Sequence, residues 1–190
     1  MPLKIIHPDH FEIVGRGIVL LSNPPSFNAS ADTYTGKLVE EIALLSKAHA
    51  IIAKEPKAVD TAKGQLTKSE FNIAIRRLCE DHGIKCVLAI AGKKEPGIEI
   101  RTLHTDESTK EMIELVRAGF AADFDVKITS RENTTDDVLS VQSKSQLITL
   151  ELGSDERGYK RDEIVATVTD SVSLINAKLG HSENPSDTLD

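Results

Sequence analysis

Residues 85–91 read Lys-Cys-Val-Leu-Ala-Ile-Ala, and this stretch decides the fold class. The run from Cys86 to Ala91 is apolar at every position, whereas a strand with one face in water alternates apolar and polar residues. It therefore predicts a strand that is buried on both faces. Such strands occur where helices cover both sides of a largely parallel sheet, so the stretch predicts an α/β protein.

The segments on either side of this strand alternate between strand and helix patterns. Residues 11–14 and 18–21 flank Gly15-Arg16-Gly17 and predict two strands joined by a tight connection. Capping-box patterns at residues 67–70 and 108–111 predict the starts of two helices. Further strands are expected at residues 50–53, 98–103, 124–128 and 147–152, and further helices at residues 33–47 and 161–179.

Together these patterns predict one α/β domain over residues 1–179. We expect three layers, with a mainly parallel or mixed central sheet and helices on both faces. Residues 180–190 are polar and contain Pro185, and are expected to form a disordered C-terminal tail.

Composition excludes several classes of protein. Of the 190 residues, 39% are hydrophobic, which is too many for a disordered chain, and no apolar run is long enough to cross a membrane. The net charge of −7 and the absence of tryptophan disfavour nucleic-acid binding. Two cysteines and no signal-peptide pattern lead us to expect a cytoplasmic protein without a disulfide scaffold. The oligomeric state stays open.

The N-terminal segment His7-Pro8-Asp9-His10 contains residue types that bind zinc. Zinc needs three or four ligands that converge from a fixed framework, and a proline-containing terminus offers poor support for one. We therefore expect a solvated terminus here, and the sequence predicts no metal ligand set.

Ligands of α/β sheets bind beyond the carboxyl ends of the strands. We expect those ends at residues 22–26, 54–60, 92–97, 129–133 and 153–158.

Glu151, between Leu150 and Leu152, points to the opposite face from these two leucines and would suit a general base. Its other interpretation is a surface glutamate on an edge strand. His104, just after a strand, is a candidate acid or base, and Arg157 is a candidate for binding a carboxylate.

The order of these segments resembles the N-formylglutamate amidohydrolase family, whose fold is related to that of the zinc carboxypeptidases. The resemblance runs from about residue 11 to residue 179. The family's Ser-x-Pro-His-Ser-Gly motif corresponds to Ser22-Asn23-Pro24-Pro25-Ser26-Phe27, its Val-Asp to Val59-Asp60, and its Asp-x-His-Gly to Ala89-Ile90-Ala91-Gly92. Its late glutamate corresponds to Glu151.

This chain departs from the family at the metal-binding positions. Pro25, Ala89 and Ala91 stand where the family has two histidines and an aspartate, and these side chains cannot bind zinc. The resemblance then implies that Glu151 remains as a base. It also implies that the ligand-contact residues are Asn23, Ser26, Asp60 and Arg157.

Three functional hypotheses follow. In the first, the chain is a divergent, metal-free member of this fold that needs no cofactor and binds a small anionic ligand or a partner without family-type hydrolysis. In the second, it is an active amide or peptide-bond hydrolase with a rebuilt site. Glu151 is then the general base with a raised pKa, His104 is its helper and zinc is the cofactor. In the third, it is a protein-interaction subunit with an exposed apolar patch. The first is preferred.

Overall fold

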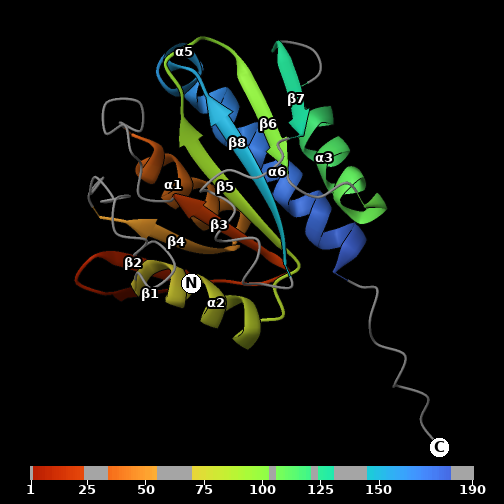
Figure 1. Cartoon of the computed structure of the whole chain (residues 1–190). Coiled ribbons are helices and arrows are strands. Elements are labelled where there is room, and N and C mark those ends of the chain that lie inside the picture. The colour runs from red at the N-terminus through yellow and green to blue at the C-terminus, as the bar shows by residue number, and fades with distance from the viewer. Residues whose placement is uncertain are drawn as a thin grey trace, which may run out of the picture.

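The computed structural model describes residues 2–23, 34–54, 70–102, 106–120, 124–130 and 145–180. Within these ranges the chain forms an eight-stranded sheet with helices on both faces (Figure 1). In chain order the elements are β1 (Leu3–Ile6), β2 (His10–Val14), β3 (Val19–Asn23), α1 (Thr35–Ser46), β4 (His49–Ala53), α2 (Glu70–Asp81), β5 (Cys86–Gly92), β6 (Ile98–Thr102), α3 (Glu107–Phe120), β7 (Val126–Ser130), β8 (Gln146–Leu152), α5 (Ser154–Arg157) and α6 (Arg161–Leu179).

The strands lie in the order β1-β2-β4-β3-β5-β8-β6-β7. The four central strands β4, β3, β5 and β8 run parallel to one another. On either side of them the direction reverses, because β2 is antiparallel to β4 and β6 is antiparallel to β8. The sheet is therefore mixed, with a parallel centre, as the sequence predicts.

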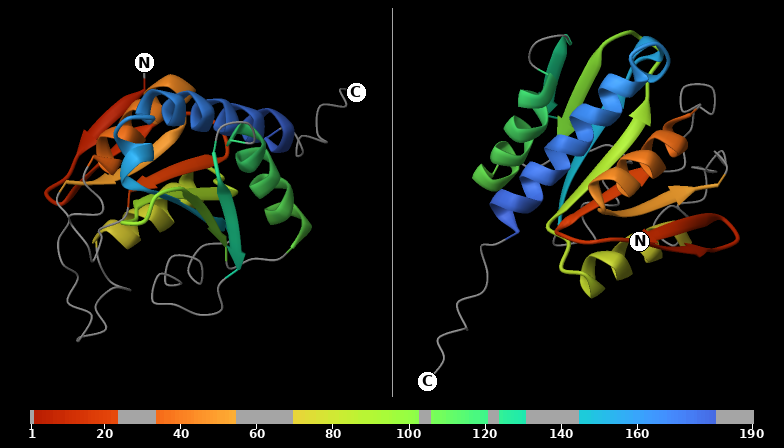
Figure 2. Two further views of the ribbon diagram at one scale, coloured as in Figure 1. Left: turned by 90° about the horizontal axis from the view of Figure 1, so that it is seen from above. Right: turned by 180° about the vertical axis from the view of Figure 1, so that it is seen from behind.

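The helices divide the structure into three layers (Figure 2, left). α1, α3 and α6 cover one face of the sheet, which we call the three-helix face, and α2 covers part of the other, which we call the α2 face. β5 contributes to both cores. Leu88 and Ile90 pack on the three-helix face, and Val87 and Ala89 pack on the α2 face. The prediction that this strand is buried on both faces is confirmed, and each large apolar side chain buried there contributes about 1.5–3 kcal/mol.

β2 and β3 follow one another in the sequence but are not neighbours in the sheet, since β4 lies between them. The connection must therefore pass across the beginning of β4. The amide of Arg16 donates to the carbonyl of Lys47 at 2.7 Å there. A Cβ atom at Gly15 would lie 2.3 Å from the carbonyl oxygens of Lys47 and Ala48, so only glycine permits this close approach.

The end of α2 and the start of α3 can be compared with the local sequence patterns that mark helix ends. α2 ends before Gly83, whose positive φ of 60° is the left-handed conformation expected after a helix. α3 differs from the prediction, because Asp106 rather than Ser108 caps it. The Asp106 carboxylate accepts a hydrogen bond from the amide of Thr109 at 3.0 Å. This bond is the main cause of the lowered pKa of Asp106.

Two described elements are absent from the predicted set. β1 carries Leu-Lys-Ile-Ile with every residue exposed, so no alternation marks it as a strand, and it forms only by pairing with β2. α5 is a single turn of four residues. Both cysteines are buried and free, and burial raises the pKa of Cys86 to about 12, so its thiol stays protonated at neutral pH. None of the helices that the structure describes is both long and apolar enough to cross a membrane.

His49, at the start of β4, is a buried titratable group on the α2 side of the sheet. Its ring lies 4.4 Å from that of His82, and its Nδ1 accepts from the Gly15 amide at 3.3 Å. Burial first, and the nearby His82 second, lower the pKa of His49 from 6.5 to about 4. The folded protein therefore keeps this ring neutral at pH values where the unfolded chain protonates it.

We predict that His49 makes the protein acid-sensitive. Its contribution to the free energy of unfolding is complete above pH 6.5 and falls by up to about 3 kcal/mol as the pH drops towards 4. His49→Asn keeps a hydrogen-bond acceptor for Gly15 but does not titrate. Urea denaturation between pH 7 and pH 4 should show a flatter pH dependence for the variant, and equal slopes for the two proteins would refute the prediction.

Candidate functional site

The carboxyl ends of β4, β3, β5 and β8 lie along one edge of the sheet, which we call the carboxyl edge. Residues 22–23, 54, 92–97 and 153–158 lie at or beyond this edge, as predicted. The expected ligand loop at residues 129–133 is placed wrongly, because β7 is parallel to β6 and therefore antiparallel to the centre. The carboxyl end of β7 points to the opposite edge.

Glu151 lies near the carboxyl end of β8, opposite Ala91 of β5. Its neighbours Leu150 and Leu152 pack on the three-helix face, so its own side chain points to the α2 face, as the alternation predicts. The side chain is largely buried and is paired with a cation. Arg101 Nη1 lies 2.7 Å from Glu151 Oε1. Glu151 is therefore one half of an ion pair between neighbouring strands.

Arg101 joins Glu151 to a second carboxylate. Its Nε donates to Glu99 Oε1 at 2.9 Å and its Nη2 donates to Glu99 Oε2 at 3.2 Å. Thr129 donates to the same Glu99 at 2.8 Å, and Lys93 Nζ lies 4.0 Å away. The hydrogen bonds from Arg101 and Thr129 and the two positive charges hold the pKa of Glu99 below its usual value, against the opposing effect of burial. We call Lys93, Glu99, Arg101, Thr129 and Glu151 the edge network.

Asn23 and Arg157 lie where the sequence places them, but both make contacts within the protein. Asn23 Nδ2 donates to Thr35 Oγ1 at 2.8 Å and to the Ile90 carbonyl at 3.4 Å. Arg157 is 8% exposed and donates to the main-chain carbonyls of Leu152, Gly153 and Lys93 at 3.1–3.2 Å. These bonds tie the segment after β8 to the end of β5. Three other predicted site residues, Ser26, Asp60 and His104, lie outside the described residues.

The positions that correspond to the family's metal ligands carry no donor atom. Ala89 and Ala91 lie on β5, with Ala89 in the α2-face core and Ala91 opposite Glu151. Pro25 lies outside the described residues. A methyl side chain cannot bind zinc, so β5 contributes no side-chain ligand at the carboxyl edge.

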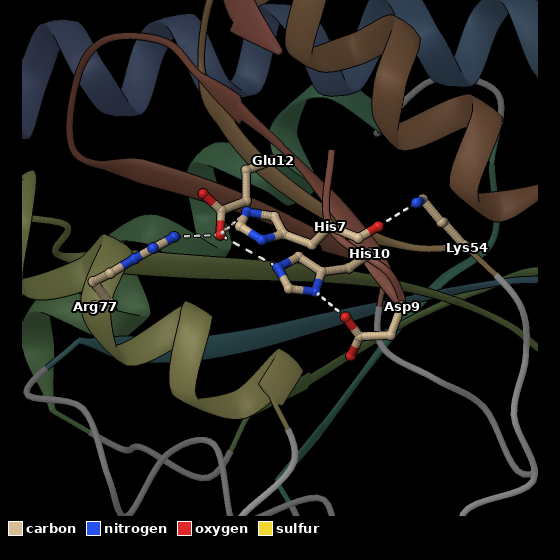
Figure 3. Close-up of polar contacts among 6 residues, drawn as sticks. All are labelled: His7, Asp9, His10, Glu12, Lys54 and Arg77. Atoms are coloured by element: carbon tan, nitrogen blue, oxygen red, sulfur yellow. Dashed lines mark hydrogen bonds and ion pairs between the residues drawn. The ribbon is translucent and has the colours of Figure 1, made fainter. Parts of the chain in front are cut away.

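A different group of metal-binding residue types converges near the N-terminus (Figure 3). His7 lies in the turn between β1 and β2, and His10 and Glu12 lie on β2. Ring nitrogens of the two histidines and a carboxylate oxygen of Glu12 all lie within 4.8 Å of one another. We call these three residues the histidine cluster. The expectation of a solvated terminus at residues 7–10 is wrong for His10, which is 3% exposed. Glu12, in the predicted strand, is 1% exposed.

Neighbouring elements hold the histidine cluster in place. The amide of His7 donates to the carbonyl of His10 at 2.9 Å, which closes the turn. The two imidazole rings stack with centroids 4.4 Å apart, and His10 packs edge-on against Phe71 of α2. His10 Nδ1 lies 2.7 Å from Asp9 Oδ1, which orients the ring. Sequence reasoning missed Glu12 as a partner of His10, because the predicted strand starts at residue 11. β2 starts at His10, and the spacing of two residues then puts both side chains on one face.

No family model and no curated protein matches the sequence. Solved structures do match. A bacteriophage poly-γ-glutamate hydrolase is 12% identical, with 94% of this chain and 93% of that chain covered and a TM-score of 0.59. An N-acetylmuramoyl-L-alanine amidase of Nostoc punctiforme is 11% identical, with coverage of 83% and 97% and a TM-score of 0.54. The protein YNDL in an apo, zinc-free form is 13% identical, with coverage of 90% and 91% and a TM-score of 0.55.

At these identities the likeness shows the fold. The three-layer α/β architecture is shared with an amidase and with a poly-γ-glutamate hydrolase. This confirms the coarser part of the resemblance drawn from the sequence. The finer part, membership of the N-formylglutamate amidohydrolase family, stays a prediction.

The edge network predicts the effect of Arg101→Gln. The change removes the charged donor shared by Glu99 and Glu151, which face each other across β6 and β8. Because a hydrogen bond to a charged group contributes about 1.5–3 kcal/mol, we expect the free energy of unfolding at pH 7 to fall by about 3 kcal/mol.

The pH dependence of this loss is a second readout. In the native protein, Glu99 stabilises the fold above its unfolded pKa of 4.5, and this contribution disappears as the pH falls through the lower folded pKa. The deficit of Arg101→Gln should therefore shrink on acidification. Denaturation curves at several pH values measure this deficit.

Arg117→Gln, at an exposed ion pair on α3, is the matched control and should lower the free energy of unfolding by under about 1 kcal/mol. An equal loss in both variants would contradict the prediction.

Proposed function

We propose that this protein binds a small anionic ligand at the carboxyl edge, and that it does not carry out family-type zinc hydrolysis there. The observation that carries the proposal is the edge network. Two cations, Lys93 and Arg101, and two carboxylates, Glu99 and Glu151, lie together on the α2 face. Their side chains are between 13% and 24% exposed, so each is partly accessible to a ligand.

The arrangement of charges favours one class of anion. A ligand carboxylate suits Arg101 and Lys93, and an amide N–H suits Glu151 or Glu99 as acceptor. An N-acylated amino acid carries both groups and has a net negative charge. The names of two structural neighbours, a poly-γ-glutamate hydrolase and an N-acetylmuramoyl-L-alanine amidase, point to the same chemistry. We therefore propose an acylated amino acid or a short peptide-like acid as the ligand.

Two features support binding without hydrolysis. β5 offers only Ala89 and Ala91 where the resemblance implies metal-binding side chains, so the carboxyl edge lacks part of the shell that would hold a catalytic zinc. Glu151 faces Arg101 at 2.7 Å, and a carboxylate held in an ion pair is a weaker general base than an isolated one. The alternative, an amide hydrolase with Glu151 as base and His104 as helper, requires Glu151 to leave this ion pair.

The test is calorimetric titration of the full chain with a panel of N-acetyl amino acids and γ-glutamyl peptides. We expect saturable binding of at least one of them. Lys93→Gln should weaken it about tenfold, because the variant removes one cation and few structural contacts. Lys94→Gln is the matched control, since the adjacent Lys94 is exposed, and should bind as the native protein does. The ligand proposal fails if nothing in the panel binds, or if the two variants are equally impaired.

A parallel assay of amine release tests the absence of hydrolysis. The same compounds are incubated with the native protein and with Glu151→Gln, each with added zinc and with chelator. We expect no release above the rate without protein. Release that requires Glu151 would instead establish the hydrolase alternative.

A further inference from the structure

We propose that the histidine cluster, His7, His10 and Glu12, is a binding site for a divalent transition-metal ion, with zinc as the best match. The site lies on β2 and the turn before it, and it is separate from the edge network on β6 and β8. Its residues differ from Pro25, Ala89 and Ala91, the positions at which the family resemblance implies metal ligands.

Two of the three distances between the ligand atoms match tetrahedral zinc coordination, and all three lie within 4.8 Å. Zinc binds imidazole nitrogen and carboxylate oxygen at about 2.0–2.2 Å, so two such ligands at a tetrahedral angle lie about 3.3–3.5 Å apart. His7 Nε2 and His10 Nε2 each lie 3.3 Å from Glu12 Oε1. Two histidines and one carboxylate also form a known zinc ligand set, and three protein ligands leave a fourth position for water.

The contacts of the imidazole nitrogens in the cluster suit a bound cation. A neutral imidazole carries one N–H, yet His10 has a carboxylate oxygen beside each ring nitrogen, Asp9 at 2.7 Å and Glu12 at 3.3 Å. His7 Nε2 is buried and has no hydrogen-bond partner, although Glu12 lies next to it. The two rings are stacked at an interplanar angle of 14°, so they must turn for both Nε2 atoms to point at one ion. A metal ion bound by both Nε2 atoms and Glu12 then satisfies all three groups. His10 then donates its Nδ1–H to Asp9, a common arrangement around zinc-binding histidines.

Binding of a metal ion to Glu12 requires the charged side chains around the cluster to rearrange. Asp9 and Glu12 are acidic, and two basic side chains lie beside the cluster (Figure 3). Arg77 of α2 donates to Glu12 Oε1, and Lys54 donates to the carbonyl of His7. Arg77 is 49% exposed, so its guanidinium can move outward when a cation binds Glu12.

Nitrogen and carboxylate ligands favour zinc and its transition-metal neighbours over magnesium or calcium, which take mostly oxygen ligands.

The test uses the full chain without a polyhistidine tag, treated with chelator and then titrated with zinc sulfate. We expect one zinc ion per chain by elemental analysis and a raised melting temperature with zinc but not with magnesium. His7→Ala should weaken zinc binding at least about 100-fold, because it removes one of three ligands. Asp9→Asn, which only disturbs the orientation of His10, should weaken it about tenfold.

Controls separate loss of the site from loss of the fold. His7 is 30% exposed, so His7→Ala should melt at the native temperature in chelator. His82→Ala removes an exposed histidine from α2's far end and should bind zinc like the native protein. Cobalt(II) should give the visible spectrum of a tetrahedral site without the thiolate charge-transfer band that Cys79 or Cys86 would produce. Zinc retained at native affinity by His7→Ala, or no zinc bound by the native chain, would overturn the proposal.

Discussion

β5 must bury both of its faces, and the rest of the structure follows from that constraint. Leu88 and Ile90 need the three-helix layer, and Val87 needs α2 on the other side. A strand in this position has parallel neighbours on both sides, β3 and β8, so the carboxyl ends of three strands meet at one edge. The same apolar requirement applies to Ala89, which is buried on the α2 face, and Ala91 follows it on that face. The strand that organises the fold therefore brings no metal-binding side chain to its own carboxyl edge.

Beside that apolar strand, Arg101 determines the electrostatics of the edge. Glu99 and Glu151 face each other across two strands and would repel if both were ionised without a cation. Arg101 donates hydrogen bonds to Glu99 and forms an ion pair with Glu151. For Glu99, these bonds and the nearby Lys93 outweigh the effect of partial burial and lower its pKa. The result is a preorganised set of donors and acceptors. Such a set suits recognition of a polar ligand better than proton abstraction, which needs a carboxylate with little stabilisation of its charge.

Local periodicity predicted most of the elements, since residues such as Ile164, Val168 and Val172 recur at helical spacing and are buried in α6. It could not predict the sheet order, because the insertion of β4 between β2 and β3 depends on tertiary packing and on the missing Cβ of Gly15. The position of Glu151 was predictable from alternation, but its pairing with Arg101 required the antiparallel register of β6. The histidine cluster was underestimated because the terminus was treated as unsupported, whereas pairing of β2 with both β1 and β4 makes it a fixed framework.

We propose that this three-layer α/β protein has an edge network at the carboxyl ends of its strands and a metal site at the histidine cluster. Zinc-edge anomalous diffraction from crystals of the zinc-loaded chain tests both halves directly. The account predicts an anomalous peak between His7, His10 and Glu12 and none beside Glu151. A peak at the carboxyl ends of β3, β5 and β8, next to Glu151, with none at the histidine cluster, would contradict it.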